Sequence, residues 1–118
     1  MPSTAKDIWE TYVKSWKVES RAEKLELMGE CLSAEPVYTD PLTQTHGREA
    51  LADYMLNFHQ QIPGGHFITT WFLDHHDRSI ARWEMRDGQG QAKGEGISYG
   101  TYDAKGRLTS MTGFFEVP

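Results

Sequence analysis

One carboxylate in this sequence stands where the backbone alone can fix its position. Asp40 ends the short apolar segment 36–39, Pro41 follows it, and a helix start at 46–51 begins six residues after Asp40. Because a proline stops a strand and the helix start anchors the chain beyond it, the acid can sit at the mouth of a cavity. An apolar surround would raise its pKa, which suits a general base near neutral pH. The alternative is an Asx-type turn with no other role.

A phenol on the first predicted helix is a natural partner for this acid. Tyr12 and Trp16 lie one helical turn apart and can face the same cavity. A buried tyrosine hydroxyl needs a hydrogen-bond partner, and a phenol opposite a general base can donate to a developing oxyanion. The alternative is that Tyr12 is an ordinary core residue.

Five histidines raise the question of a metal site, and their spacing argues against one. His75 and His76 are adjacent in a predicted strand, so we expect their side chains to point to opposite faces. His46, His59 and His66 lack ligand spacing such as His-x-x-x-His with a carboxylate. We therefore expect no metal, and we expect no other cofactor. We place His66 at the cavity wall, where it or His75 could transfer a proton; a structural role is the alternative for each.

Nucleophilic and phosphate-binding chemistry find little support. Cys31 lies on the apolar stripe of a predicted helix, where an inert buried thiol is expected. No serine lies in a Gly-x-Ser-x-Gly elbow, and Gly88 and Gly90 join two predicted strands without preceding a helix.

Composition and charge set the broad class. The 118 residues (13.5 kDa) fit one domain, 1–118, with a single core. A net charge of −5 and dispersed Lys and Arg argue against a nucleic-acid partner. One cysteine excludes an intramolecular disulfide, residues 1–7 form no hydrophobic signal segment, and no apolar run approaches transmembrane length. A soluble cytoplasmic protein without a membrane partner is the expectation.

The sequence pattern predicts helices in the first half and strands in the second. Helices are predicted at 4–17, 20–32 and 48–61. Strands are predicted at 36–39, 67–75, 79–86, 92–102 and 108–117. Ser3 or Thr4 can cap the first helix. Helices followed by a strand meander indicate an α+β fold, with an antiparallel sheet covered by helices on one face.

Glycines inside the predicted strands suggest that the sheet is curved. Gly94, Gly96, Gly100 and Gly113 stand where glycine usually marks a bulge or a bend. A curved sheet closed by helices makes a cone with a hollow end. Alternatively, some of these glycines let an aromatic side chain lie close against the backbone.

This order of elements resembles the nuclear transport factor 2-like superfamily, and within it the SnoaL-like and ketosteroid isomerase-like small proteins. The resemblance covers nearly all of the chain. The motifs that carry it are Tyr12-Val13, Val37-Tyr38-Thr39-Asp40-Pro41, His46-Gly47-Arg48-Glu49-Ala50-Leu51, Gly106-Arg107-Leu108 and Ser110-Met111 through Phe115. It implies a cone-shaped barrel, in which a curved antiparallel sheet wraps around three helices of the N-terminal half, and a homodimer formed across the outer sheet face. It leaves the activity open, because the fold hosts isomerases, cyclases, hydrolases, dehydratases and pure binders.

Three site residues are implied by the resemblance to the isomerase branch. Asp40 matches the general base that moves a proton next to a ketone, and Tyr12 matches the tyrosine that binds the oxyanion. Ser98 stands where that branch carries a protonated carboxylic acid. Since serine is a much weaker acid, this departure argues against efficient steroid isomerisation.

The leading hypothesis is a cofactor-independent isomerase- or lyase-type enzyme that moves a proton next to the carbonyl of a small apolar, ketosteroid- or polyketide-like substrate. Asp40 would be the base, with Tyr12 and Ser98 as hydrogen-bond donors. The residues expected to line the cavity are Trp16, Tyr54, Phe58, His66, Trp83, Met111 and Phe115. The rival hypothesis is a non-catalytic module that binds a small hydrophobic metabolite. A third is a structural dimeric domain whose own aromatic residues fill the cavity.

Overall fold

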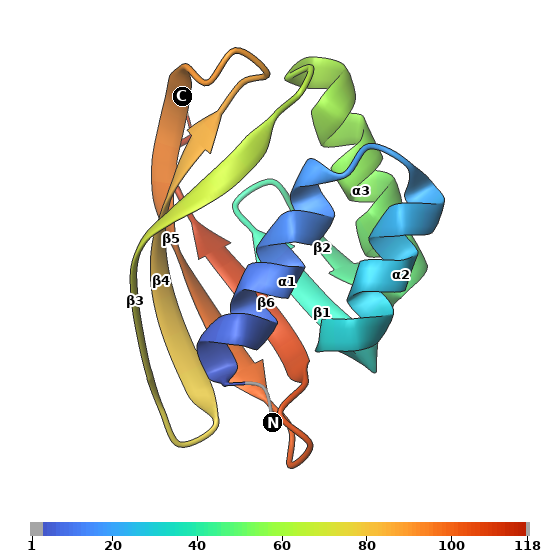
Figure 1. Cartoon of the computed structure of the whole chain (residues 1–118), viewed down its shortest axis with the longest axis vertical. Coiled ribbons are helices and arrows are strands. Elements are labelled where there is room, and N and C mark those ends of the chain that lie inside the picture. The colour runs from blue at the N-terminus through green and yellow to red at the C-terminus, as the bar shows by residue number, and fades with distance from the viewer. Residues whose placement is uncertain (1–3, 118) are drawn as a thin grey trace.

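Three helices pack against one face of a strongly curved sheet (Figure 1). The computed structural model describes residues 4–117. The helices are α1 (Ala5–Lys17), α2 (Arg21–Cys31) and α3 (Arg48–Gln61). The strands are β1 (Leu32–Asp40), β2 (Thr43–His46), β3 (His66–His75), β4 (Arg78–Arg86), β5 (Ala92–Tyr102) and β6 (Leu108–Phe114). The predicted α+β class, with a curved sheet around three helices, is confirmed.

The six strands form one sheet in the order β2-β1-β6-β5-β4-β3. All neighbouring strands of the described chain run antiparallel except β1 and β6, which run parallel. The prediction of a wholly antiparallel sheet therefore needs this correction. β1 and β6 are distant in sequence, and the elements between them return the chain to the same end of the sheet. Because β2 and β3 remain as edges, the curved sheet is not closed.

Most of the predicted element boundaries agree with the structure. α3 spans the predicted 48–61, and α1 begins just after Thr4, whose side chain accepts from the backbone of Asp7 in a capping box. Ser3, the alternative cap, lies outside the described residues. β6 ends at Phe114 rather than at residue 117.

The largest disagreement concerns the segment around Asp40. β1 starts at Leu32, four residues before the predicted strand, and β2 was not predicted. The Asp-Pro pair does end a strand, but the chain then reverses, and Asp40 pairs with Thr43 in a tight hairpin. Proline fits here because the turn requires no backbone donor from it.

Two of the strand glycines make room for tryptophan rings. A Cβ atom on Gly96 would overlap the ring of Trp83, and a Cβ atom on Gly100 would lie 3.3 Å from the ring of Trp9. Neither glycine has a positive φ. At these two positions, the glycine lets an aromatic ring lie close against the backbone, which was the alternative to a bulge or bend. Both rings lie against the inner face of the sheet.

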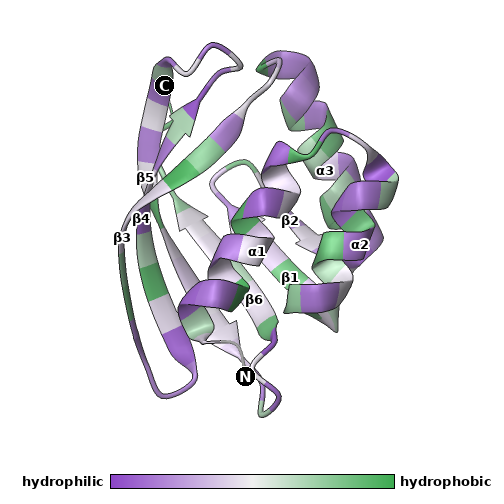
Figure 2. Ribbon diagram, in the orientation of Figure 1, coloured by the Kyte–Doolittle hydropathy of each residue, from purple (hydrophilic) through white to green (hydrophobic). Residues whose placement is uncertain are grey.

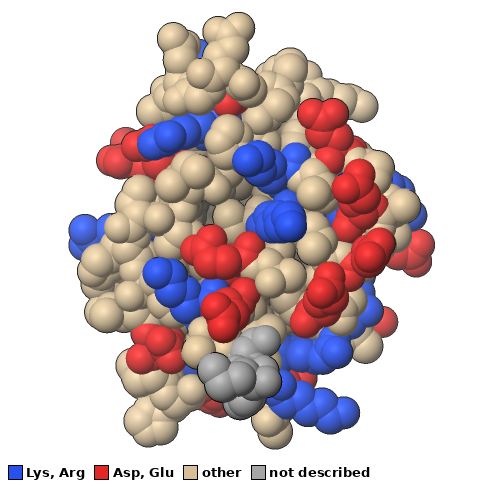
Figure 3. Space-filling view, viewed as in Figure 1, with Lys and Arg blue, Asp and Glu red and all other residues tan. Residues whose placement is uncertain are grey.

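Hydrophobic and hydrophilic residues alternate along the three helices (Figure 2). The residues that each helix buries are Trp9, Tyr12, Ser15 and Trp16 on α1, Lys24, Met28 and Cys31 on α2, and Leu51, Ala52 and Met55 on α3. On α2, Cys31 of the predicted apolar stripe is buried together with Met28, and Leu25 is half-buried, while the buried Leu32 begins β1. Lys and Arg are interspersed with Asp and Glu over the face in Figure 3, which agrees with the dispersed charge of the sequence. Within residues 4–117, no helix is both long and apolar enough to cross a membrane.

A fully buried lysine, which was not predicted, joins the three helices. Lys24 of α2 donates from Nζ to the carbonyl oxygens of Ser15 and Val18, at 3.0 and 2.6 Å, at the end of α1. Its Nζ also lies 3.0 Å from Nε2 of His59 on α3. Burial lowers the pKa of His59, so this imidazole is neutral and accepts from the lysine. A cation here satisfies the free carbonyls of the α1 C-terminus.

Replacing this lysine should destabilise the fold. We expect Lys24→Met to lower the free energy of unfolding by about 2–4 kcal/mol, because the buried carbonyl oxygens lose their donor. Urea denaturation followed by circular dichroism measures the change. Lys17→Met, an exposed lysine in the last turn of α1, is the matched control and should change stability by less than about 0.5 kcal/mol. Equal effects of the two substitutions would contradict this role.

Candidate functional site

A cavity of about 520 Å³ lies between the helices and the inner face of the sheet. Its residues come from α1, α3, β1, β3, β4, β5, β6 and adjoining loops. Aromatic side chains form much of its wall: Trp9, Tyr12, Trp16, Tyr38, Tyr54, Phe58, Phe67, Trp83 and Phe115. The other side chains in the wall are Val13, Asp40, Leu42, Asn57, Gln61, Ile62, Met85, Lys93, Glu95, Ser98 and Glu116. A cavity of this size and composition suits a small, largely apolar molecule.

Asp40 lies in this cavity with only 8% of its surface exposed, and each of its two carboxylate oxygens accepts two hydrogen bonds. Oδ1 accepts from the backbone N–H groups of Leu42 and Thr43 at 2.8 and 3.0 Å. Oδ2 accepts from the hydroxyls of Tyr38 and Tyr54 at 2.7 and 2.8 Å. Asp40 therefore makes the Asx-type turn with one oxygen and faces the cavity beside two phenols with the other, and its role as a general base stays a prediction.

Strand periodicity and helix placement bring the two phenols to Asp40. Tyr38 precedes Asp40 by two residues in β1, so both side chains lie on the same face of the strand. Tyr54 reaches the same oxygen from α3. Burial raises the pKa of both phenols, and their hydrogen bonds to Asp40 raise it further. Both hydroxyls therefore stay protonated and donate to the carboxylate.

Tyr12 is the phenol in the cavity wall that remains available for a ligand. It is 4% exposed, and its hydroxyl donates to no other residue in the range 4–117. Burial raises the pKa of Tyr12, a hydrogen bond from the indole of Trp16 acts to lower it, and the negative charge of Asp40 adds a smaller increase. The group is thus a protonated donor near the carboxylate, as an oxyanion-binding role requires.

Ser98 lies across β6 from Asp40. Its Oγ accepts a hydrogen bond from the indole Nε1 of Trp83 at 3.0 Å, which leaves its own hydroxyl proton free to donate. A Cβ atom on Gly113, in β6, would lie 3.7 Å from both the Asp40 Cβ and the Ser98 Oγ. The absence of a side chain at this glycine keeps open the space between the acid and the serine.

The aromatic rings support one another around the cavity. The ring of Trp16 lies 5.7 Å from that of Tyr38, 5.5 Å from that of Phe58 and 5.3 Å from that of Phe67, measured between centroids. The ring of Phe67 lies 5.0 Å from that of Trp83 at a nearly perpendicular angle. Such edge-to-face contacts fix ring positions, so the cavity wall is rigid rather than loosely packed.

The structure brings together eight of the ten residues named from the sequence: Asp40, Tyr12, Ser98, Trp16, Tyr54, Phe58, Trp83 and Phe115. The other two do not line the cavity. His66 neighbours the inward-facing Phe67 in β3 and therefore turns to the opposite face, where its Nδ1 lies 3.1 Å from the carbonyl oxygen of Gly64. Met111 is almost completely buried in the core.

Several residues of the cavity wall were not predicted from the sequence. Trp9 precedes Tyr12 on the inner face of α1, and Phe67 lies on the inner face of β3, so helical and strand periodicity carried a signal for both. Tyr38 carried one too, because it shares a strand face with Asp40. The polar side chains Asn57, Gln61, Lys93, Glu95 and Glu116 are exposed, and their pattern in the sequence indicated only solvent contact.

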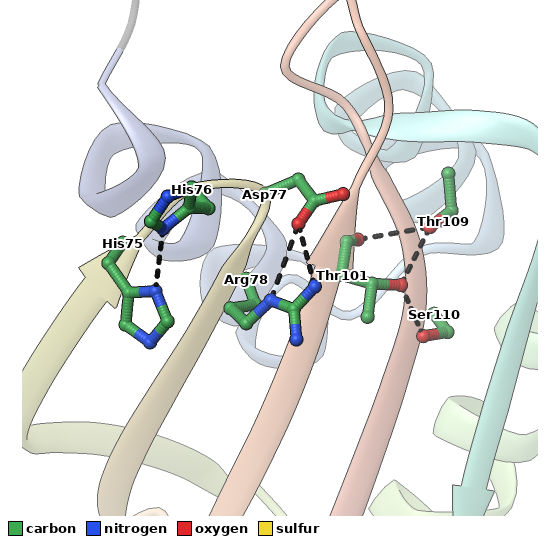
Figure 4. A network of polar contacts seen from close by, with 7 residues as sticks. All are labelled: His75, His76, Asp77, Arg78, Thr101, Thr109 and Ser110. Atoms are coloured by element: carbon green, nitrogen blue, oxygen red, sulfur yellow. Dashed lines mark hydrogen bonds and ion pairs between the residues drawn. The ribbon is translucent and has the colours of Figure 1, made fainter.

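The histidine pair at the end of β3 departs from its prediction. His76 lies in the turn with a φ of 52° rather than in the strand, so its ring folds back toward His75 (Figure 4). The two Nδ1 atoms are 3.0 Å apart, and the side chains do not point to opposite faces as we predicted. Within residues 4–117, no group of three or more His, Cys, Asp or Glu is placed to hold a metal ion.

The structure agrees with the prediction that Cys31 is an inert, buried thiol. It is completely buried, donates to the carbonyl oxygen of Leu27 at 3.3 Å, and lies outside the cavity wall. Burial raises its pKa to about 12, so the nucleophilic thiolate is not formed at neutral pH.

Comparison with known proteins gives one family and several structures of the same fold. The model of the SnoaL-like domain family matches residues 10–116. No curated protein matches the sequence. An Agrobacterium tumefaciens structure, provisionally described as an isomerase of the SnoaL-like family, is 23% identical with a TM-score of 0.87, over 96% of this chain and 97% of that one.

Two further structures share the fold at lower identity. A Catenulispora acidiphila protein with a ketosteroid isomerase-like fold, in complex with trimethylamine, is 13% identical with a TM-score of 0.77, over 97% of this chain and 88% of that one. A Sinorhizobium meliloti protein, provisionally described as a polyketide cyclase, is 12% identical with a TM-score of 0.72, over 94% of this chain and 99% of that one. At these identities the structures establish the fold and leave the activity open.

Removing the hydroxyl of either tyrosine that donates to Asp40 should destabilise the fold, and the two losses should differ in size. We expect Tyr38→Phe to lower the free energy of unfolding by about 1.5–3 kcal/mol, because a buried hydrogen bond to a charged group is lost. Tyr54→Phe should cost about 1 kcal/mol, because Tyr54 is only half-buried and water can replace its hydroxyl. Urea denaturation provides the comparison. Tyr99→Phe, on the outer sheet face, is the control, and losses no larger than its own would contradict the arrangement.

Proposed function

Because this chain belongs to the SnoaL-like domain family, we propose that its cavity is an active site that moves a proton next to the carbonyl group of a small, mostly apolar molecule. One observation carries the proposal: a buried carboxylate, Asp40, faces an aromatic cavity in which a protonated phenol, Tyr12, donates to no other residue among residues 4–117. A base and a separate donor in one largely aromatic cavity are the two groups that enolisation of a ketone requires.

The residues take distinct roles in this proposal. Asp40 removes a proton from the carbon next to the carbonyl, and the electron pair of the broken C–H bond passes to the carbonyl oxygen. Tyr12 donates a hydrogen bond to that oxygen, and Ser98 is the second candidate donor. Asp40 then returns the proton to a different carbon, so no cofactor or net redox change is needed.

A substrate must displace one of the four donors to Asp40 before the acid can act as a base. Tyr54 is the donor best placed to leave, because Tyr38 is buried and the other two donors are backbone groups of the turn. Its hydroxyl can then turn from the carboxylate to the substrate. This exchange uncovers a lone pair on Oδ2 without leaving a buried polar group unpaired.

The second candidate function is a non-catalytic module that binds a small hydrophobic metabolite. It is favoured by the same four hydrogen bonds, because they fill the acceptor positions at which the carboxylate would take up a proton. The fold alone does not separate the two functions, since the nuclear transport factor 2-like superfamily includes both enzymes and binders.

Substitution of Asp40 separates these candidates. We expect the protein to convert 3-cyclohexenone, a small β,γ-unsaturated ketone, to its conjugated isomer, and Asp40→Asn to slow the reaction by about 10²- to 10⁴-fold. Ultraviolet absorbance follows the conjugation, and deuterium incorporation from heavy water follows the proton transfer by NMR. Asp53→Asn is the control, because Asp53 is an exposed acid on α3 that pairs with Arg21. Full activity in Asp40→Asn would rule out the acid as the base.

We also propose that the protein forms a homodimer across the outer face of the sheet. Trp71, Arg82, Ile97 and Phe114 follow one another in register across β3 to β6, and the three apolar members of this row are 40%, 37% and 60% exposed in chain order. The Arg82 guanidinium lies over the Trp71 ring at 4.9 Å. Apolar side chains exposed in a continuous row on one sheet face support a protein interface.

A charge placed in this row should prevent association. We expect the wild-type protein to elute with twice the 13.5 kDa mass of the chain, and Phe114→Asp to elute as a monomer, because a carboxylate would be buried at the interface without a partner. Size-exclusion chromatography with light scattering gives the masses. Phe114→Leu keeps an apolar side chain and should remain dimeric. A monomeric wild-type protein would refute the proposed interface.

A further inference from the structure

The charge of Asp40 is not balanced by any cation within the described part of the chain. All four of its hydrogen-bond donors are neutral, two being phenols and two backbone N–H groups. None of the ion pairs formed by residues 4–117 includes Asp40. Neutral donors spread the negative charge but do not cancel it, and a buried charge without a counter-ion is unfavourable. A bound cation would therefore find a ready partner in this carboxylate.

The other charged residues of the cavity wall add to the negative charge. Among the described residues, the wall carries the carboxylates Glu95 and Glu116 in addition to Asp40, against the single ammonium group of Lys93. Lys93 is exposed, and its Nζ lies 3.7 Å from the carboxylate of Asp87, outside the cavity wall. A cavity with this balance repels carboxylates and phosphates and attracts cations.

The aromatic wall favours one kind of cation. Electron-rich ring faces attract an ammonium group, most strongly where water is excluded. The cavity has many rings near its carboxylate: those of Tyr38 and Tyr54, which bond to Asp40, lie 5.7 and 6.2 Å from that of Trp16. An alkylated ammonium presents methyl groups to these rings and loses little hydration when buried. A primary ammonium is strongly hydrated and would leave its N–H groups unpaired against the same wall.

We propose that the ligand of this cavity is an organic cation, whose tertiary or quaternary ammonium group lies against the aromatic rings with Asp40 as its counter-ion. The inference deepens the proposed function and rests on it for one point only, that the cavity is the ligand site. If the protein is an enzyme, its substrate is then a carbonyl compound that carries an alkylated ammonium group rather than an anionic thioester or a free acid.

A pair of probes with the same shape and different charge tests this inference. Choline and 3,3-dimethylbutan-1-ol differ by a nitrogen in place of a carbon, so their affinities report the effect of charge alone. We expect choline to bind at least about tenfold more tightly in an NMR or calorimetric titration at low salt. Asp40→Asn should reduce this preference to less than about threefold, because the counter-ion is removed. Asp53→Asn, outside the cavity wall, should leave the preference unchanged.

A ring variant keeps the test valid if Asp40→Asn fails to fold. Phe58→Leu retains an apolar side chain in the cavity wall but removes a ring face, so it should weaken choline binding more than binding of the alcohol. Equal affinity for the two probes, or no binding of choline, would overturn the inference.

Isomerisation of 3-cyclohexenone in the same preparations keeps the two proposals apart. Isomerisation without a choline preference leaves the proposed function standing and rejects the cation. A choline preference without isomerisation supports the cation and favours the binding module.

Discussion

Four neutral donors hold the carboxylate of Asp40, and the surrounding structure depends on that contact. Two donors are backbone N–H groups in the turn between β1 and β2, one is a phenol of β1, and one is a phenol of α3. The carboxylate therefore sets the conformation of the hairpin and ties α3 to the sheet. Because β2 leads directly into Gly47 and the start of α3, the turn at Asp40 also determines where that helix begins. Loss of the acid would leave four donors without their acceptor at once, so Asp40 has a structural role in addition to the proposed chemical one.

The cavity exists because bulky residues support one another around it instead of filling it. Trp16 contacts rings from β1, α3 and β3, and Gly96 lets the Trp83 ring lie against the sheet and reach Ser98. An unfilled space of this size gives up contacts that a solid core would have. Well-capped helices and the buried contacts of Lys24 offset part of that loss. The cost of the cavity to stability supports the proposal that it holds a ligand.

Local patterns predicted the parts of this structure that local forces decide. The helical spacing of apolar residues gave the limits of α3, and one helical turn between Tyr12 and Trp16 placed both in the cavity wall. The hairpin at Asp40 and the parallel pairing of β1 with β6 depend on partners that no local pattern identifies. We predicted His66 in the cavity wall, but the side chain of its neighbour Phe67 lies there instead. A shift of one residue along a strand moves a side chain to the opposite face of the sheet. The burial of Lys24 was not predicted because a lysine is normally solvated. Its burial is favourable here only because the ends of three helices meet around it.

The saturation of Asp40 bears on catalysis in a specific way. Four donors occupy the acceptor positions of this carboxylate in the resting protein, so catalysis requires that one donor leave as the substrate arrives. If that donor is the Tyr54 hydroxyl and it turns to the carbonyl oxygen, the acid gains a free lone pair as the oxyanion gains a hydrogen bond. The interaction is then stronger in the transition state than in the resting state, which is the condition for a rate enhancement. A ligand that only binds has no need of this exchange and leaves all four donors in place. The partner of the Tyr54 hydroxyl when a ligand is bound therefore distinguishes an enzyme from a binding protein.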